Sequence, residues 1–182
     1  MRHKPLVLVF ALFGYMTVLA QSDLKIVDRI VNFGMKAAEN RTIDAVIVHS
    51  VYNAAEGDKY DVDLVIKEFS DYGVSSHYVI GRDGTIYQLV KEKNISYQAG
   101  KSSLPDGRTN VNTCSIGIEI ITSKDSLDTP TKFQIKSLTA LVKDIQSRYK
   151  IKYVLRHSDI APGRKTDPWN MNWDDFLARI SK

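Results

Sequence analysis

The residues with the clearest chemical potential lie in one stretch near the C-terminus, residues 156–168, which reads RHSDIAPGRKTDP. It follows a short apolar run at 153–155 that is typical of a buried strand, and its prolines and glycine predict a loop. Loops on a rigid scaffold are where binding and catalytic residues concentrate. His157 and Asp167 lie ten positions apart, so this loop can fold back and direct both at one ion. We interpret them as two ligands of a zinc ion, with Lys165 beside them.

A second histidine, His49, ends another predicted buried strand at 44–48. If this strand and the one before His157 are parallel neighbours, both imidazoles emerge at the sheet edge where α/β proteins place their sites. Catalytic zinc needs three protein ligands and an open position, and Asp167 would supply the third. The alternative is that each histidine is a satisfied structural residue. His77 is the rival third ligand, but it begins a predicted strand, so we place it near the site as a packing or substrate-orienting residue.

Glu119 lies within the predicted central strand 115–121 and has apolar neighbours on both sides. An ionised carboxylate buried there without a partner would cost several kcal/mol, unless it faces a polar cavity. Burial would raise its pKa, while a nearby zinc ion would lower it. Such a carboxylate can take a proton from water and pass it to a leaving amine. The alternative is a buried salt bridge, for example with an arginine.

The motif at 157–168 resembles the C-terminal motif of zinc-dependent N-acetylmuramoyl-L-alanine amidases, a family that includes phage lysozyme-type amidases and catalytic peptidoglycan recognition proteins. Two more segments resemble this family, VIVHS at 46–50 and NTCSIGIEI at 112–120. The resemblance implies one Zn²⁺ per chain and gives each matching residue a role. Those residues are the ligands His49, His157 and Asp167, the proton shuttle Glu119 and the oxyanion-stabilising Lys165.

The resemblance also implies the substrate, which is the amide between the lactyl group of N-acetylmuramic acid and L-Ala in peptidoglycan or muropeptides. Without the resemblance, the residues themselves support only a general reaction class, which is metal-assisted hydrolysis of an amide. Two rivals are a non-catalytic peptidoglycan-binding module and a zinc peptidase of the stem peptide. Relatives often carry a Trp-His-Ala-Gly-like segment at the position of residues 97–100. This chain has Gln98 in place of the histidine, and an amide side chain cannot titrate. We expect Gln98, Asn112, Arg164 and His77 to contact substrate, although bracing of loops explains Asn112 and Arg164 equally well.

The remaining pattern predicts an α/β fold, with a single domain and a central mixed β-sheet flanked by helices. Two further strands are expected at 77–80 and 85–89, and an Asp-Gly turn would join them. The segment 91–112 is expected to be a long loop over the site. Helical spacing of apolar residues predicts helices at 23–38, 62–72, 131–149 and 173–180. We therefore expect an N-terminal helical extension at 21–42 and an amidase catalytic domain at 43–182.

The first 20 residues have a basic start, an apolar core and a small-residue end, which is typical of a secretory signal peptide and too short for a spanning helix. Removing them takes two basic residues from a formal net charge of +4, so no nucleic-acid partner is indicated. The single Cys114 excludes an internal disulfide. We expect an exported, periplasmic or secreted bacterial monomer with no membrane span after signal cleavage.

Overall fold

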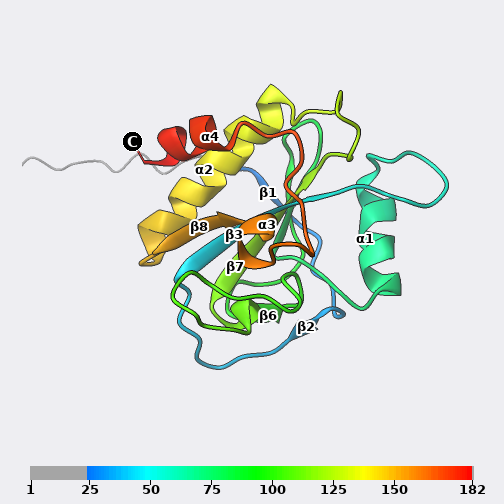
Figure 1. Ribbon diagram of the computed structural model, residues 1–182. Coiled ribbons are helices and arrows are strands. Elements are labelled where there is room, and N and C mark those ends of the chain that lie inside the picture. Colours follow the sequence, from blue (N-terminus) through cyan, green and yellow to red (C-terminus); the bar gives the residue numbers. More distant parts are fainter. Residues whose placement is uncertain (1–23, 182) are drawn as a thin grey trace, which may run out of the picture.

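A mixed β-sheet forms the centre of the computed structural model, which describes residues 24–181 (Figure 1). β4 (Tyr78–Ile80) and β5 (Ile86–Gln88) are antiparallel, while the other neighbouring pairs of this sheet are parallel. The predicted mixed sheet is therefore confirmed. The six strands follow the order β1 (Ile26–Asp28), β5, β4, β7 (Ser115–Ile121), β3 (Ala45–Val51) and β8 (Tyr153–Arg156). A separate two-stranded sheet pairs β2 (Met35–Lys36) with β6 (Ile95–Ser96).

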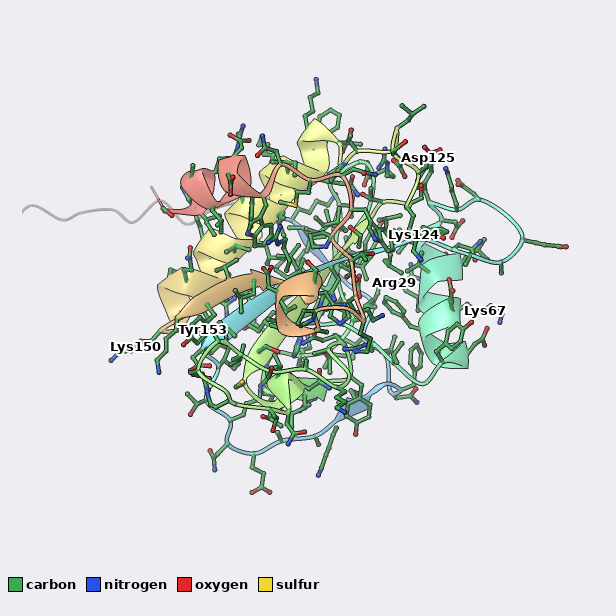
Figure 2. The ribbon with its side chains drawn as sticks, in the orientation of Figure 1. Arg29, Lys67, Lys124, Asp125, Lys150 and Tyr153 are labelled. Atoms are coloured by element: carbon green, nitrogen blue, oxygen red, sulfur yellow. The ribbon has the colours of Figure 1, made fainter. Side chains whose placement is uncertain are left out.

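Helices cover both faces of the central sheet. α2 (Lys132–Arg148) and α4 (Trp173–Ile180) lie side by side on one face, and α1 (Val62–Asp71) lies at the other side of the molecule (Figure 1). In Figure 2, Tyr153 and Lys150 lie near β8 at one side of the view, and Lys67 lies on α1 at the other. Two short elements complete the fold, the 3-10 helix η1 (Val111–Thr113) and the one-turn helix α3 (His157–Ile160).

The alternation of side chains along β3 and β7 decides what each face carries. Even-numbered residues such as Val48 and Ile118 pack beneath α2 and α4 in the largest apolar cluster. Odd-numbered residues face the other way, where Ile47 packs against Ile160 of α3 and Ile121 belongs to the cluster that α1 covers. The same alternation places His49 and Glu119 on this second face, which loops and short helices cover.

The helix predicted at 23–38 is wrong, because the segment contains β1 and β2 instead. Backbone pairing with distant strands overrides the local helical spacing: β1 is parallel to β5, and the Val31 N–H donates to the Leu89 carbonyl at 2.9 Å. Gly34 adds a second constraint, since it has φ of +59° and a Cβ there would lie 2.1 Å from the Val74 backbone. A right-handed helix has negative φ at every residue, so the chain cannot be helical at Gly34.

The other predicted elements are confirmed with small shifts at their ends. β3 continues past His49 to Val51, because β7 offers partners up to Ile121. β8 includes Arg156, and His157 begins a helical turn rather than ending a strand. The predicted signal peptide, residues 1–20, lies outside the described residues. Within residues 24–181 no helix combines the length and apolar character needed to cross a bilayer.

Candidate functional site

Three buried side chains converge at the carboxyl end of β3 and β8. His49 lies on β3, and His157 follows β8 directly after the paired positions Val48 and Arg156. The two imidazole rings are 4.3 Å apart between centroids. Asp167 Oδ2 lies 3.1 Å from His157 Nδ1 and 3.5 Å from His49 Nδ1. One ligand atom from each residue lies within 4.8 Å of the others, so this cluster could hold a metal ion.

The loop after α3 folds back to bring Asp167 to the two histidines. The Ser158 N–H donates to the Asp167 carbonyl at 3.0 Å, and the Ser50 N–H lies 3.4 Å from Asp167 Oδ2. The hydroxyl of Ser50 also accepts from the Trp169 N–H at 3.1 Å. Ser50 of β3 and the backbone N–H of Ser158 in α3 therefore anchor the loop around the carboxylate. The sequence prediction that this loop returns toward one point is confirmed.

The hydrogen bonds around both rings show that the cluster suits a cation. His157 Nε2 lies 3.2 Å from the Ala99 carbonyl oxygen, and His49 Nε2 contacts Oε1 of Gln98. Both partners are acceptors that suit a hydrogen on each Nε2, and in that tautomer the Nδ1 lone pair of each ring is available to a cation held beside Asp167. Burial lowers the pKa of His49 to about 4, which keeps that ring neutral at pH 7. Two lone pairs and a carboxylate facing one point form the donor set of a zinc-type site.

Asp167 is ionised in this arrangement. Burial acts to raise the pKa of its carboxyl group, but the contacts with His157 and His49 outweigh burial and hold the pKa well below its usual range. The cluster therefore has a negative charge at its centre, and a divalent ion would compensate it.

Glu119 stands beside the cluster on β7, as the register partner of His49. Its side chain is buried, and its Oε2 atom has no hydrogen-bond partner among the described residues. Burial and the nearby Asp167 raise the pKa of Glu119 well above its usual value, although Lys165 acts in the opposite direction. The alternative of a buried salt bridge with an arginine is not formed within residues 24–181. A buried carboxylate with a free oxygen can exchange a proton with a bound molecule.

Glu119, His157 and Asp167 line a cavity of about 710 Å³ that opens to solvent. Its volume suits a ligand larger than a single amino acid. Lys165 is exposed at the wall of this cavity, two residues before Asp167. The lining also includes polar and aromatic side chains, among them Tyr52, Tyr97, Gln98, Asn112, Lys124, Arg164 and Trp169.

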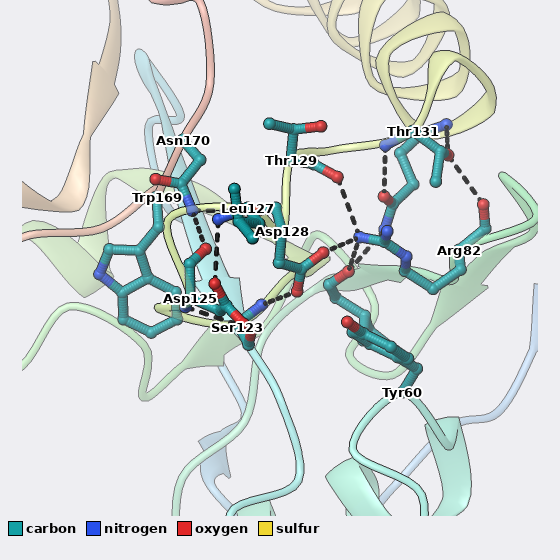
Figure 3. Close-up of polar contacts among 12 residues, drawn as sticks. Tyr60, Arg82, Ser123, Asp125, Leu127, Asp128, Thr129, Thr131, Trp169 and Asn170 are labelled. Carbon is teal, nitrogen blue, oxygen red and sulfur yellow. Dashed lines mark hydrogen bonds and ion pairs between the residues drawn. The ribbon is translucent and has the colours of Figure 1, made fainter.

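One wall of the cavity is held by contacts between the segment after β7 and the segment before α4. Asn170 Nδ2 donates to the carbonyl oxygens of Asp125 at 2.6 Å and Asp128 at 2.9 Å (Figure 3). The ammonium group of Lys124 lies 5.4 Å from the centroid of the neighbouring Trp169 ring, within cation–π range. These contacts give the cavity an aromatic wall with a positive charge beside it.

Three of the four predicted substrate contacts line the cavity, but their polar groups are used in bracing. Asn112 Oδ1 accepts from the backbone N–H groups of Gln98 at 3.2 Å and Ala99 at 2.8 Å. Arg164 Nη2 donates to the carbonyl oxygens of Ala99 at 2.8 Å and Lys101 at 2.7 Å. Both side chains therefore hold the loop that contains Gln98 against the metal cluster.

His77, the fourth predicted contact, is not among the residues that line the cavity. It is fully buried, and burial lowers its pKa to about 3. Its Nδ1 accepts from the Gly117 N–H at 3.0 Å, and its Nε2 lies 3.1 Å from the Asn94 carbonyl. With both ring nitrogens engaged inside the protein, His77 braces β7, which agrees with the packing role among the two alternatives predicted for it.

Sequence reasoning missed two residues near the cluster, Ser115 and Gly117. Both lie on the same face of β7 as Glu119, and Gln98 packs directly against them. A signal was present, because a glycine inside an apolar strand often marks a close approach of another part of the chain.

Comparison with known proteins agrees with this site. The chain is 37% identical over 124 residues to N-acetylmuramoyl-L-alanine amidase AmiD of Escherichia coli K12, covering 59% of this chain and 45% of that protein. It is also 37% identical over 120 residues to 1,6-anhydro-N-acetylmuramyl-L-alanine amidase AmpD of the same organism, covering 63% of each. This chain thus spans less than two thirds of the length of these two relatives.

The fold comparison points the same way. A solved structure of E. coli AmiD in complex with anhydro-N-acetylmuramic acid-L-Ala-D-gamma-Glu-L-Lys superposes with a TM-score of 0.65 and 32% identity, over 75% of this chain and 57% of that one. The family model for N-acetylmuramoyl-L-alanine amidases matches residues 39–170, which include the whole metal cluster together with Glu119 and Lys165. With the greater part of its length matched by that model, the chain belongs to the N-acetylmuramoyl-L-alanine amidase family.

Proposed function

We propose that this protein is a zinc-dependent amidase that hydrolyses the bond between N-acetylmuramic acid and L-alanine in peptidoglycan or its soluble muropeptides. The observation that carries the proposal is the convergence of His49, His157 and Asp167 beside an unpartnered Glu119 in an open cavity. A zinc ion held by the three ligands would polarise the scissile carbonyl and lower the pKa of water to roughly 7.

The protein's own side chains supply the other requirements of amide hydrolysis. Glu119, with its raised pKa and a free oxygen, accepts a proton from the attacking water and delivers it to the leaving amine of L-alanine. Lys165, at the cavity wall, stabilises the negative charge that develops on the carbonyl oxygen. Relatives named for acting on 1,6-anhydro-N-acetylmuramyl-L-alanine support soluble anhydro-muropeptides as one substrate class.

The test is product analysis with purified protein on two substrates, intact sacculi and soluble muropeptides, followed by labelling of new amino termini. The proposal predicts that free amino-terminal L-alanine appears as the lactyl carboxyl group is released. New amino termini at other residues would instead show a peptidase of the stem peptide. Binding without any product, in a preparation shown to contain zinc, would show a non-catalytic peptidoglycan-binding module.

We also propose that the enzyme is exported and acts as a monomer. The pattern of residues 1–20 supports export. Because His49, His157, Asp167 and Glu119 converge within a single chain, a monomer would hold every proposed ligand and the proposed proton carrier. Mass spectrometry of protein recovered from a bacterial periplasmic fraction should give a mature chain that starts near Gln21. Light scattering should give the mass of one chain.

A further inference from the structure

We propose that Gln98 is a positioning residue that fixes the orientation and tautomer of His49, and that Ser115 locks Gln98 in turn. The inference rests on the proposed function, because the ion concerned is the one that His49 would bind. In this proposal Gln98 and Ser115 support His49 from outside the set of the three ligands, Glu119 and Lys165.

A chain of hydrogen bonds gives the direction of each donor. The Ser115 hydroxyl donates its single hydrogen to the Val111 carbonyl oxygen at 2.7 Å. It must then accept from its other neighbour, the Gln98 amide nitrogen, at 2.9 Å. The amide NH₂ of Gln98 therefore points at Ser115, and its Oε1 points at His49 Nε2. With this acceptor, His49 donates through Nε2, which leaves the Nδ1 lone pair for the cation that Asp167 would also bind.

The strand beneath Gln98 is shaped to receive this side chain. Gly117 lies between Ser115 and Glu119 on the same face of β7, and an ideal Cβ at position 117 would lie 2.5 Å from Cγ of Gln98 and 2.8 Å from Cδ. Only a residue without a side chain lets Gln98 lie flat across the strand at this point. The backbone of Gln98 is fixed as well, by the hydrogen bond from its N–H to Asn112 Oδ1.

The same loop serves the second imidazole through its backbone. The Ala99 carbonyl oxygen accepts from His157 Nε2, just as the Gln98 side chain accepts from His49 Nε2. Outer partners of this kind set the orientation and basicity of metal-binding histidines. Because both polar ends of Gln98 are already engaged, the positioning role explains its contacts better than the substrate contact predicted from the sequence.

The experiment compares full-length variants in which a single acceptor is lost. Gln98→Met keeps the length of the side chain without its polar atoms, and Gln98→Glu restores an acceptor for His49. Gln88→Met is the matched control, because Gln88 lies on β5 and bonds to the Tyr78 hydroxyl. Ser115→Ala removes the lock, and Ser137→Ala is its control on α2, where Ser137 bonds to the Gly84 carbonyl.

Three readouts do not depend on turnover: zinc affinity by competition with a chromophoric chelator, the absorption spectrum of the cobalt-substituted protein, and the imidazole nitrogen signals of His49 by NMR. We expect Gln98→Met to weaken zinc binding by roughly 10- to 100-fold and to alter the cobalt spectrum, with a smaller loss for Ser115→Ala. Gln98→Glu should bind zinc at least as tightly as the native protein, and both controls should be unchanged.

The inference is overturned if Gln98→Met binds zinc as tightly as the native protein, with the same cobalt spectrum and the same His49 tautomer. It is equally overturned if Gln98→Glu binds as weakly as Gln98→Met. These results leave the proposed function intact. A native protein that binds zinc and releases no amino-terminal L-alanine contradicts the proposed function alone.

Discussion

His49 and Glu119 are register partners on two neighbouring parallel strands, β3 and β7. Their side chains therefore share one face and one level of the central sheet, with Asp167 brought against His49 from a loop. This relationship places the proposed metal ligand and the proposed proton carrier side by side through backbone hydrogen bonding, so neither depends on a loop for its position.

Removal of zinc should lower both activity and thermal stability. Because the outermost ligands, His49 and Asp167, lie 118 positions apart along the chain, the ion would join distant parts of the fold. An ion present at 100 times its dissociation constant stabilises the folded state by about 2.7 kcal/mol. For a chain of this size that corresponds to a melting temperature roughly 5–10 °C higher with zinc than with a chelator, measured by calorimetry. Asp167→Asn should lose most of this zinc-dependent shift, and a full shift in that variant would remove Asp167 from the ligand set.

Glu119→Gln should keep zinc and lose most turnover. The amide keeps the size of the side chain but cannot accept the proton of the attacking water, so we expect kcat to fall by about 10²- to 10⁴-fold. Metal analysis of the same preparation should give the native zinc content. Near-native kcat in a zinc-loaded variant would show that another group carries the proton.

The same substitution should stabilise the metal-free protein at high pH. Burial raises the pKa of Glu119 above its ordinary value of 4.5, so the folded state holds this proton more tightly than the unfolded state. Below that ordinary value both states are protonated and there is no penalty. As the pH rises above it, the unfolded state ionises first and the folded state loses relative stability. Urea unfolding of chelated protein should show Glu119→Gln more stable than native at pH 8, with the difference shrinking toward pH 4; an advantage independent of pH would contradict this explanation.

Lys165→Ala should lower kcat with little effect on zinc content. Loss of one group that stabilises the developing oxyanion is expected to reduce kcat by about 10²- to 10³-fold. Lys165→Arg should recover part of the rate, because it keeps the positive charge. Lys67→Ala provides the matched control, since Lys67 is an exposed residue of α1 paired with Asp71. Equal rates for Lys165→Ala and this control would remove Lys165 from the mechanism.

Gly117→Ala should weaken zinc binding although position 117 touches no ion. The added methyl group would meet the side chain of Gln98, which is flexible enough to move aside, so the fold should survive. The displaced amide would leave His49 without its acceptor. We expect a loss of zinc affinity close to that of Gln98→Met, measured by chelator competition, and a circular dichroism spectrum like that of the native protein. Native zinc affinity in this variant would mean that Gly117 has no part in holding Gln98 against His49.

Local patterns in the sequence were enough to predict the strand at 115–121 and the helix at 173–180, because these elements depend on residue type and on spacing along short segments. The meeting of His49, His157 and Asp167 joins distant parts of the chain, and its prediction needed the positions of the two strand ends together with the resemblance to the amidase family. The error at 23–38 arose because pairing with β5 and Leu89, which lie far away in sequence, decides the conformation of that segment.

The bracing of the site could not be predicted for the same reason. Whether Gln98 reaches His49 depends on the empty space above Gly117 and on the position of Asn112, and neither is visible without the fold. A titratable residue is recognisable from its chemistry, whereas the role of an amide depends on its neighbours.

The loop formed by residues 97–100 is both a wall of the cavity and the outer support of two ligands, since Tyr97 faces the cavity while Gln98 and Ala99 hold the imidazoles. A bound sugar or peptide that displaces this wall would move the hydrogen-bond acceptors of both histidines at once. Occupancy of the cavity and the exchange rate of the metal should therefore be linked, so a bound muropeptide should change the rate at which the ion is lost.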